Sequence, residues 1–204
     1  GPRTSRKIIH VGTGPLYVVC WFLFSTSPTA RFLAALVPLA ITLQFAAVGL
    51  GRIHDEDAVQ AMTRHGEPRE MLRGPLIYGL VFVVCTLVFW RSDPVGIVAL
   101  MILCGGDGLA DLVGRRWGKR RLPHNPSKSW AGSAAMFLGG TLLALAMTAA
   151  FAAAGLFDPP LPPNAVASIG VIALACTLVE TLPLADIDNL TISATAVVLG
   201  LALL

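Results

Sequence analysis

The apolar residues of this 204-residue chain lie in long blocks joined by short polar connections. Most blocks are about 15–23 residues long, close to the ~20 apolar residues that cross the hydrocarbon core of a bilayer as a helix. A backbone inside lipid must satisfy its own hydrogen bonds, so such blocks form helices or a closed barrel. The apolar residues do not alternate with polar ones, which excludes the barrel. The blocks are 8–24, 32–50, 75–90, 95–113, 131–156, 165–179 and 190–204.

The sequence therefore predicts an all-α fold, a polytopic transmembrane bundle of about seven helices in a single integral membrane domain over residues 1–204. The composition agrees, with 55% hydrophobic and 13% charged residues, against about 25% charged in soluble domains. The first block lacks a small-residue cleavage site and contains His10 and Pro15, unlike a signal peptide. The chain opens on Gly1-Pro2 without a Met, which indicates a processed end. We expect membrane lipid to surround the protein, and we expect no nucleic-acid partner. The sequence does not determine the oligomeric state.

Lys and Arg residues concentrate on alternate connections. The N-terminal segment, residues 51–74 and residues 114–130 hold nearly all of them, whereas the intervening connections carry Arg31, Arg91 or none. Positive charge marks the cytoplasmic side of a membrane protein, so 51–74 and 114–130 are predicted to be cytoplasmic connecting segments. The Arg-rich, Ala-rich composition points to a bacterial inner membrane, with the functional face toward the cytoplasm.

Two aspartates stand at the predicted cytoplasmic end of the fourth block. Asp107 and Asp111 are four residues apart, so a helix places them on one face. Mg²⁺ typically takes one or two carboxylates together with phosphate oxygens, which makes this pair a candidate metal site. Gly105 and Gly106 precede the pair and Gly108 lies within it, as expected if the backbone must approach a ligand closely. A polar helix end facing water is the simpler alternative.

A dense basic segment follows the aspartates. Arg115, Arg116, Arg120 and Arg121 fit either phosphate binding or anchoring to anionic lipid. Lys128 stands apart in the sequence NPSKSWAGS, just before the fifth block, where the start of a helix adds N–H groups that favour phosphate. We therefore expect Lys128 to contact phosphate.

A third polar cluster, VETLPLADIDNLT, joins the sixth and seventh blocks. Glu180 closes one block, and Asp188 and Asn189 open the next; Asp186 is a weaker candidate. Such carboxylates complete a metal site or accept a proton from an attacking hydroxyl. Helix capping by Asp188 or Asn189 is the alternative.

Other features of the sequence are less specific. The chain has no GxxxxGK[ST] or GxGxxG segment, so a nucleotide must be held in another way. The four cysteines stand singly inside apolar blocks, which disfavours zinc. Residues 52–74 are interpreted as a helix lying on the membrane surface, broken near Gly66 and Pro68, or as a solvated connector.

Four segments in order resemble the CTP-dependent polyprenol kinase family, closest to its phytol and farnesol kinase branch. They are RKIIHVGTG (6–14), GDGLADLVGRRWG with Gly105 before it (together 105–118), LPHNPSKSWAGS (122–133) and VETLP with DNLT (179–191). The middle pair is also similar to phosphatidate cytidylyltransferases, whose Lys is followed by Thr-x-Glu-Gly. Here Lys128 is followed by Ser-Trp-Ala-Gly, and the missing Glu favours the kinase branch.

The resemblance implies transfer of the terminal phosphate of CTP to an isoprenoid alcohol of the phytol, farnesol or geranylgeraniol type, which yields the alkyl monophosphate and CDP. It implies Mg²⁺ at Asp107 and Asp111, completed by Glu180, and the triphosphate at Lys128. It further implies that Asp188 lies near the alcohol and that the nucleotide is contacted by Arg115, Arg116, Lys7, His10 and Asn189.

The alcohol is expected to enter sideways from the bilayer. Ala131, Ala135 and Gly139 in the fifth block are spaced by four, which permits either close helix packing or a lipid groove. The alternatives to the kinase are a cytidylyltransferase that makes a CDP-lipid and a transporter. A transporter would place charges near mid-membrane, whereas these charges lie at one boundary.

Overall fold

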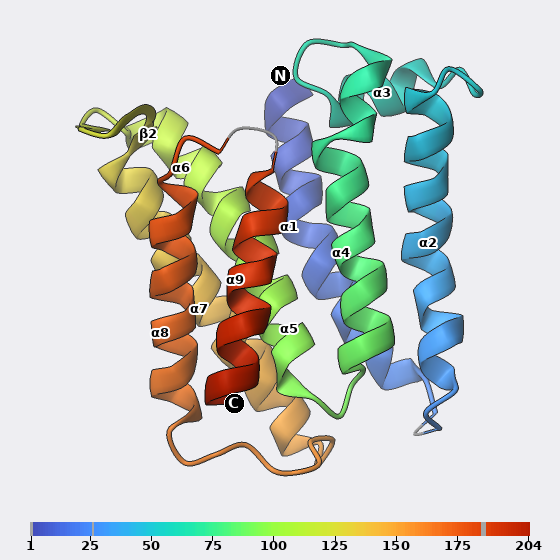
Figure 1. Cartoon of the computed structure of the whole chain (residues 1–204), viewed down its shortest axis with the longest axis vertical. Helices are drawn as coiled ribbons and strands as arrows, with labels where there is room; N and C mark the ends of the chain where they lie inside the picture. Colours follow the sequence, from blue (N-terminus) through green and yellow to red (C-terminus); the bar gives the residue numbers. More distant parts are fainter. Residues whose placement is uncertain (1, 26, 185–186) are drawn as a thin grey trace.

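The computed structural model is a bundle of helices with one short β-hairpin at one end (Figure 1). It describes residues 2–25, 27–184 and 187–204, with side chains from residue 11 onward. The elements are α1 (Pro2–Cys20), η1 (Trp21–Leu23), α2 (Ala30–Gly49), α3 (Glu56–Met62), η2 (Pro68–Leu72), α4 (Gly74–Phe89), α5 (Pro94–Met101), η3 (Ile102–Asp107), α6 (Gly108–Trp117), β1 (Arg121–Leu122), β2 (Asn125–Ser129), α7 (Trp130–Ala153), α8 (Ala165–Glu180) and α9 (Asp188–Leu203). The predicted all-α class is confirmed, and the hairpin was not predicted.

Four helical stretches in the described part of the chain are long and apolar enough to cross a membrane: Ala30–Gly49, Pro68–Phe89, Pro94–Trp117 and Trp130–Ala153. Three shorter apolar helices accompany them, Val11–Leu23, Ala165–Glu180 and Asp188–Leu203. Large apolar side chains cover the outside of the bundle, including Leu33, Leu142 and Leu201, which are all more than half exposed. An apolar exterior of this extent is the surface that lipid covers.

The stretch Pro94–Trp117, made of α5, η3 and α6, is the centre of the bundle. Of its 18 most apolar consecutive residues, 83% are buried, and every residue from 97 to 104 is fully buried. Helix α5 contacts α4, α7, α9 and α1. This continuous apolar run is therefore buried by protein on all sides, and it carries Asp107 at its end.

Glycines bring η3 and α6 into close contact with α7. A Cβ atom on Gly139 would lie 3.0 Å from the Gly105 carbonyl oxygen, and one on Gly132 would lie 2.9 Å from the Ala110 carbonyl oxygen. A Cβ atom on Gly106 would likewise lie 3.3 Å from atoms of α7. The close approach that these glycines permit is thus between helices, which corrects the interpretation that Gly105 and Gly106 make room for a ligand. Of the three small residues spaced by four in α7, Gly139 lies at this close contact between helices.

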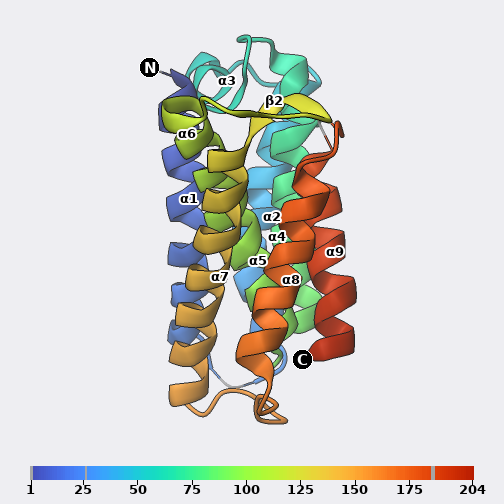
Figure 2. The same ribbon diagram turned by 90° about the vertical axis from the view of Figure 1, so that its left-hand side faces the viewer.

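The polar segments gather at one end of the bundle. The β1–β2 hairpin is antiparallel, and Ser129 at its end caps α7 by accepting a hydrogen bond from the Gly132 N–H at 3.1 Å. Helix α3 lies across the same end, and Gly66, with φ of 79°, turns the chain toward Pro68, the first residue of η2 (Figure 1). The connection between α7 and α8 lies at the opposite end, as Figure 2 also shows. The charged connections are thereby brought together on one face.

Candidate active site

A cavity of about 560 Å³ opens at the end of the bundle that carries the hairpin. Residues from six places in the sequence line it: the α3–η2 connection, the η3–α6 junction, the hairpin, the start of α7, the end of α8 and the start of α9. Its charged lining residues, with one histidine, are Arg64, His65, Asp107, Asp111, Arg115, Arg121, Lys128, Glu180 and Asp188. Charges of both signs therefore face one space at the boundary of an apolar bundle.

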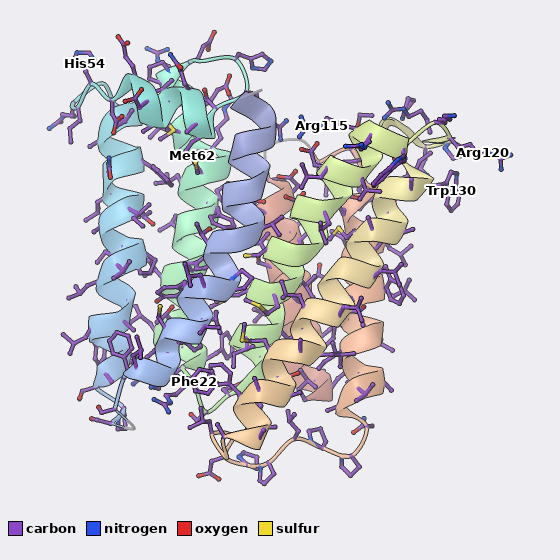
Figure 3. All side chains as sticks on the ribbon, turned by 180° about the vertical axis from the view of Figure 1, so that it is seen from behind. Phe22, His54, Met62, Arg115, Arg120 and Trp130 are labelled. Atoms are coloured by element: carbon purple, nitrogen blue, oxygen red, sulfur yellow. The ribbon has the colours of Figure 1, made fainter. Side chains whose placement is uncertain are left out.

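The two aspartates enter the cavity from the junction of η3 and α6. Asp107 is the last residue of η3, a π-helical turn, and is 4% exposed. Single π-helical turns within α-helices are frequent at functional sites. Asp111 lies on the first turn of α6, is more exposed, and forms an ion pair with Arg115 one turn later. Figure 3 shows Arg115 on the upper part of α6, on the side that faces α1.

Lys128 and Glu180 form an ion pair across the cavity, although 52 positions separate them in sequence. Glu180 ends α8 and its side chain is only 3% exposed, while Lys128 extends from β2. Burial by itself lowers the pKa of Lys128, but the carboxylates of Glu180, Asp107 and Asp188 outweigh it and raise that pKa above its ordinary value. The ammonium group is therefore charged at neutral pH and lies among carboxylates.

Asn125 fixes the hairpin against the end of α8. Its amide Nδ2 donates to the Thr181 carbonyl oxygen at 3.0 Å, and its Oδ1 accepts from the Ser127 hydroxyl at 2.6 Å. The side chain is 6% exposed. By holding β2 beside Glu180, Asn125 sets the position of Lys128.

The start of α9 contributes one residue to the lining. Asp188 faces the cavity, whereas Asn189 does not line it: its amide donates to the Gly74 carbonyl oxygen at 3.1 Å and so joins α9 to α4. Neither side chain caps α9, whose N-cap position is Ile187 without a side-chain hydrogen bond. Asn189 is placed to hold Asp188 in position.

Some residues singled out in the sequence lie elsewhere. Arg116 is outside the cavity lining, with its guanidinium 5.4 Å from the ring centre of the exposed Trp117. Arg120 points away at the outer edge of the hairpin, near Trp130 (Figure 3). The side chains of Lys7 and His10, and all of Asp186, lie outside the described residues.

The cavity also includes residues that sequence reasoning missed or undervalued. Arg64 and His65 line it, although segment 52–74 was given either a surface or a connector role. Nothing in the sequence indicates the role of Asn125, because an amide in a polar loop is common and its hydrogen-bond partner Thr181 lies 56 positions away. Arg121 also lines the cavity; the sequence was compatible with either phosphate binding or lipid anchoring for this residue.

The described residues contain no group of three or more His, Cys, Asp or Glu side chains placed to hold a metal ion. Asp107, Asp111 and Glu180 line one cavity without forming such a group, and Glu180 is engaged by Lys128. Because Mg²⁺ commonly takes one or two carboxylates and completes its shell with phosphate and water, this donor set suits an ion that arrives with a phosphate ligand.

Comparison with known proteins gives close relatives over most of the chain. It is 46% identical over 190 residues to probable phytol kinase 1, chloroplastic, of Oryza sativa subsp. japonica, covering 92% of this chain and 60% of that protein. It is 40% identical over 203 residues to farnesol kinase, chloroplastic, of Arabidopsis thaliana, covering 98% of this chain and 66% of that protein. It is 36% identical over 190 residues to phytol kinase 1, chloroplastic, of Arabidopsis thaliana, covering 92% and 62%.

The chain thus spans 60–66% of the length of these relatives. No family model matches it. No solved structure matches it. The names of the relatives give a chloroplast location for those proteins, so they do not support the expected bacterial inner membrane. The identity over at least nine-tenths of the sequence shows that this chain belongs to the phytol and farnesol kinase family.

Proposed function

We propose that the protein is a membrane-embedded kinase that transfers the terminal phosphate of CTP to an isoprenoid alcohol of the phytol, farnesol or geranylgeraniol type. The products are the alkyl monophosphate and CDP. One observation carries the proposal: a cavity that combines carboxylates and cations lies at the end of an apolar bundle in a chain whose relatives are named phytol and farnesol kinases. A charged nucleotide and a lipid alcohol meet only at such a boundary.

The cations of the cavity are proposed to bind the triphosphate. Phosphoryl transfer depends mainly on positioning and on neutralising charge. Lys128, Arg115 and Arg121 reach the cavity from the hairpin and α6. Because Lys128 is held by Glu180 and Arg115 by Asp111, incoming phosphate oxygens compete with these carboxylates for the cations. Nucleotide binding then releases the carboxylates for the metal ion or the alcohol.

Asp107 and Asp111 are the residues that would hold Mg²⁺, with Glu180 as a third candidate once Lys128 turns to phosphate. Bound there, Mg²⁺ would supply neutralisation of the charge on the phosphate oxygens. The burial of Asp107 at the end of the central helix fixes its carboxylate before any ligand arrives. That fixed position favours catalysis, since reacting groups must be held in place rather than recruited.

Asp188 is proposed to orient the alcohol and to accept its proton as the new O–P bond forms, with Glu180 as the alternative acceptor. Asp188 begins α9, beside the cavity, and Asn189 holds that helix start against α4. A general base must lie within hydrogen-bond reach of the proton it removes. The alcohol's hydroxyl reaches this carboxylate from the bilayer, while its chain stays among the helices.

We further propose that the four long and three shorter apolar helices all cross the membrane, as seven spans of one domain. The cavity then lies on the cytoplasmic side, because the Lys- and Arg-rich segments 51–74 and 114–130 border it. The α7–α8 connection lies on the other side.

The test is an assay of the purified protein with CTP or ATP and a panel of phytol, farnesol, geranylgeraniol and a longer polyprenol, with products identified by mass. We expect an alkyl monophosphate and CDP. Release of pyrophosphate with a CDP-lipid would instead identify a cytidylyltransferase, and the absence of both products across the panel would refute the proposal.

A further inference from the structure

We propose that Arg64 and His65 form a second wall of the cavity and contact the phosphates of the nucleoside triphosphate, with Glu70 as the residue that positions them. Arg64 and His65 lie in the connection between α3 and η2, and Glu70 lies in η2; we call residues 63–70 the Glu70 loop. This inference rests on the proposed function, because it assumes a triphosphate in the cavity.

Glu70 holds the Glu70 loop through several hydrogen bonds. Its carboxylate accepts the backbone N–H of Arg64 at 2.5 Å and that of His65 at 3.1 Å. The same carboxylate lies 2.7 Å from Nδ1 of the His65 ring. A hydrogen bond at one ring nitrogen fixes the orientation of an imidazole and leaves the other nitrogen for a partner. Glu70 thus sets both the backbone and the ring.

The loop is anchored at both ends. Thr63 is buried, donates to the Val59 carbonyl oxygen at 2.6 Å and accepts from the Gly66 N–H at 3.1 Å. On the other side, Met71 is fully buried against Val59 and its neighbours from α2. The backbone that carries Arg64 and His65 is therefore fixed, although both side chains are exposed to the cavity.

The charge of the cavity explains what this wall adds. Arg115 and Lys128 reach the cavity from α6 and the hairpin. Arg64 brings a guanidinium from a separate element, and a guanidinium matches phosphate oxygens with two parallel N–H donors. A triphosphate in this cavity would have cations from the Glu70 loop, α6 and the hairpin, in the same space as Asp107 and Asp111.

Substrate discrimination provides the test. CMP, CDP and CTP share the base and sugar and differ in the number of phosphates, so their affinities report phosphate contacts directly. We expect Arg64→Ala to weaken CTP binding by about 10-fold or more, as for one charged hydrogen bond, while CMP binding stays within about twofold. His65→Ala should act in the same direction with a smaller loss. Arg69→Ala is the matched control, because Arg69 is an exposed cation of the same loop that does not line the cavity.

The positioning role of Glu70 has its own readout. Glu70→Ala should reduce the preference for CTP over CMP as Arg64→Ala does. The double variant Arg64→Ala, Glu70→Ala should lose no more of this preference than either single variant. If Glu70→Ala fails to fold, Arg64→Lys, which keeps the charge without the paired donors, should recover part of the CTP affinity lost in Arg64→Ala.

Two results would overturn the inference, and they point to different errors. If the wild type phosphorylates an isoprenoid alcohol but Arg64→Ala keeps the full CTP-over-CMP preference, the Glu70 loop does not contact phosphate while the proposed function survives. If the wild type binds CTP no better than CMP, the inference and the proposed function fail together.

Discussion

Replacing Lys128 by Met separates two roles of the Lys128–Glu180 ion pair, structural and catalytic. Met is unbranched and nearly as long as Lys but carries no charge, so the substitution leaves the Glu180 carboxylate, at 3% exposure, without its cation. Breaking one partner of a buried ion pair costs about 3–5 kcal/mol. Because the Lys128 side chain is 27% exposed, water compensates part of this loss, and we expect a free energy of unfolding lower by about 2 kcal/mol.

The loss of turnover should have a different cause, which is the missing positive charge near phosphate. It should therefore persist when a second substitution restores the stability. Removal of a charge clamp from a partly dry site lowers turnover by about 100-fold or more, which corresponds to ~2.7 kcal/mol in the barrier. The double variant Lys128→Met, Glu180→Gln carries no unpaired charge, so its thermal unfolding in detergent should return close to that of the wild type while its turnover stays low.

Initial rates and thermal unfolding of the two variants decide between the roles. Turnover within about threefold of the wild type in Lys128→Met would remove Lys128 from phosphate binding. Recovery of turnover in the double variant would show that Lys128 serves only as a counter-ion for Glu180. Both measurements use the same detergent-purified protein, so a folding defect cannot be mistaken for a catalytic one.

Three further predictions address the metal site, helix packing and pH. Asp107→Asn and Asp111→Asn should each abolish turnover while the protein stays folded in detergent; Mg²⁺-dependent turnover persisting in both would exclude the pair. Gly139→Ala should lower the unfolding free energy by about 1–3 kcal/mol, because its Cβ would lie 3.0 Å from the Gly105 carbonyl oxygen; unchanged thermal unfolding would contradict this packing. The pKa of Lys128 is raised above its ordinary value by the neighbouring carboxylates, so its stabilising effect is complete below the ordinary pKa and is lost as pH rises through the higher folded-state pKa; a loss of the stability difference between wild type and Lys128→Met already near neutral pH would disprove the assignment.

The predicted helices agree with the structure because lipid imposes a simple rule on the backbone. A long apolar block has no solvent partner for its N–H and C=O groups, so it is helical wherever it stands in the chain. The blocks 75–90 and 165–179 accordingly match α4 and α8 within one residue at each end. The charges on alternate connections likewise predicted which polar segments share one end of the bundle.

The sequence also predicted that Asp107, Lys128 and Glu180 would gather on one face, but not how they are paired. Lys128 contacts Glu180 because Asn125 binds the Thr181 carbonyl oxygen and draws the hairpin onto α8. The hairpin itself was missed, since two short strands in a polar loop carry no apolar periodicity.

By itself, then, the sequence determined the membrane-embedded helices, the face on which the charges lie and the family, because each depends on residues close together in the chain. The tertiary structure decided which partner each charge has, that Gly105 and Gly106 serve contact with α7, and that Arg64 and His65 reach the cavity. These outcomes depend on contacts between segments far apart in sequence. Composition and spacing say which groups share a surface, whereas only packing brings a given pair within hydrogen-bond distance.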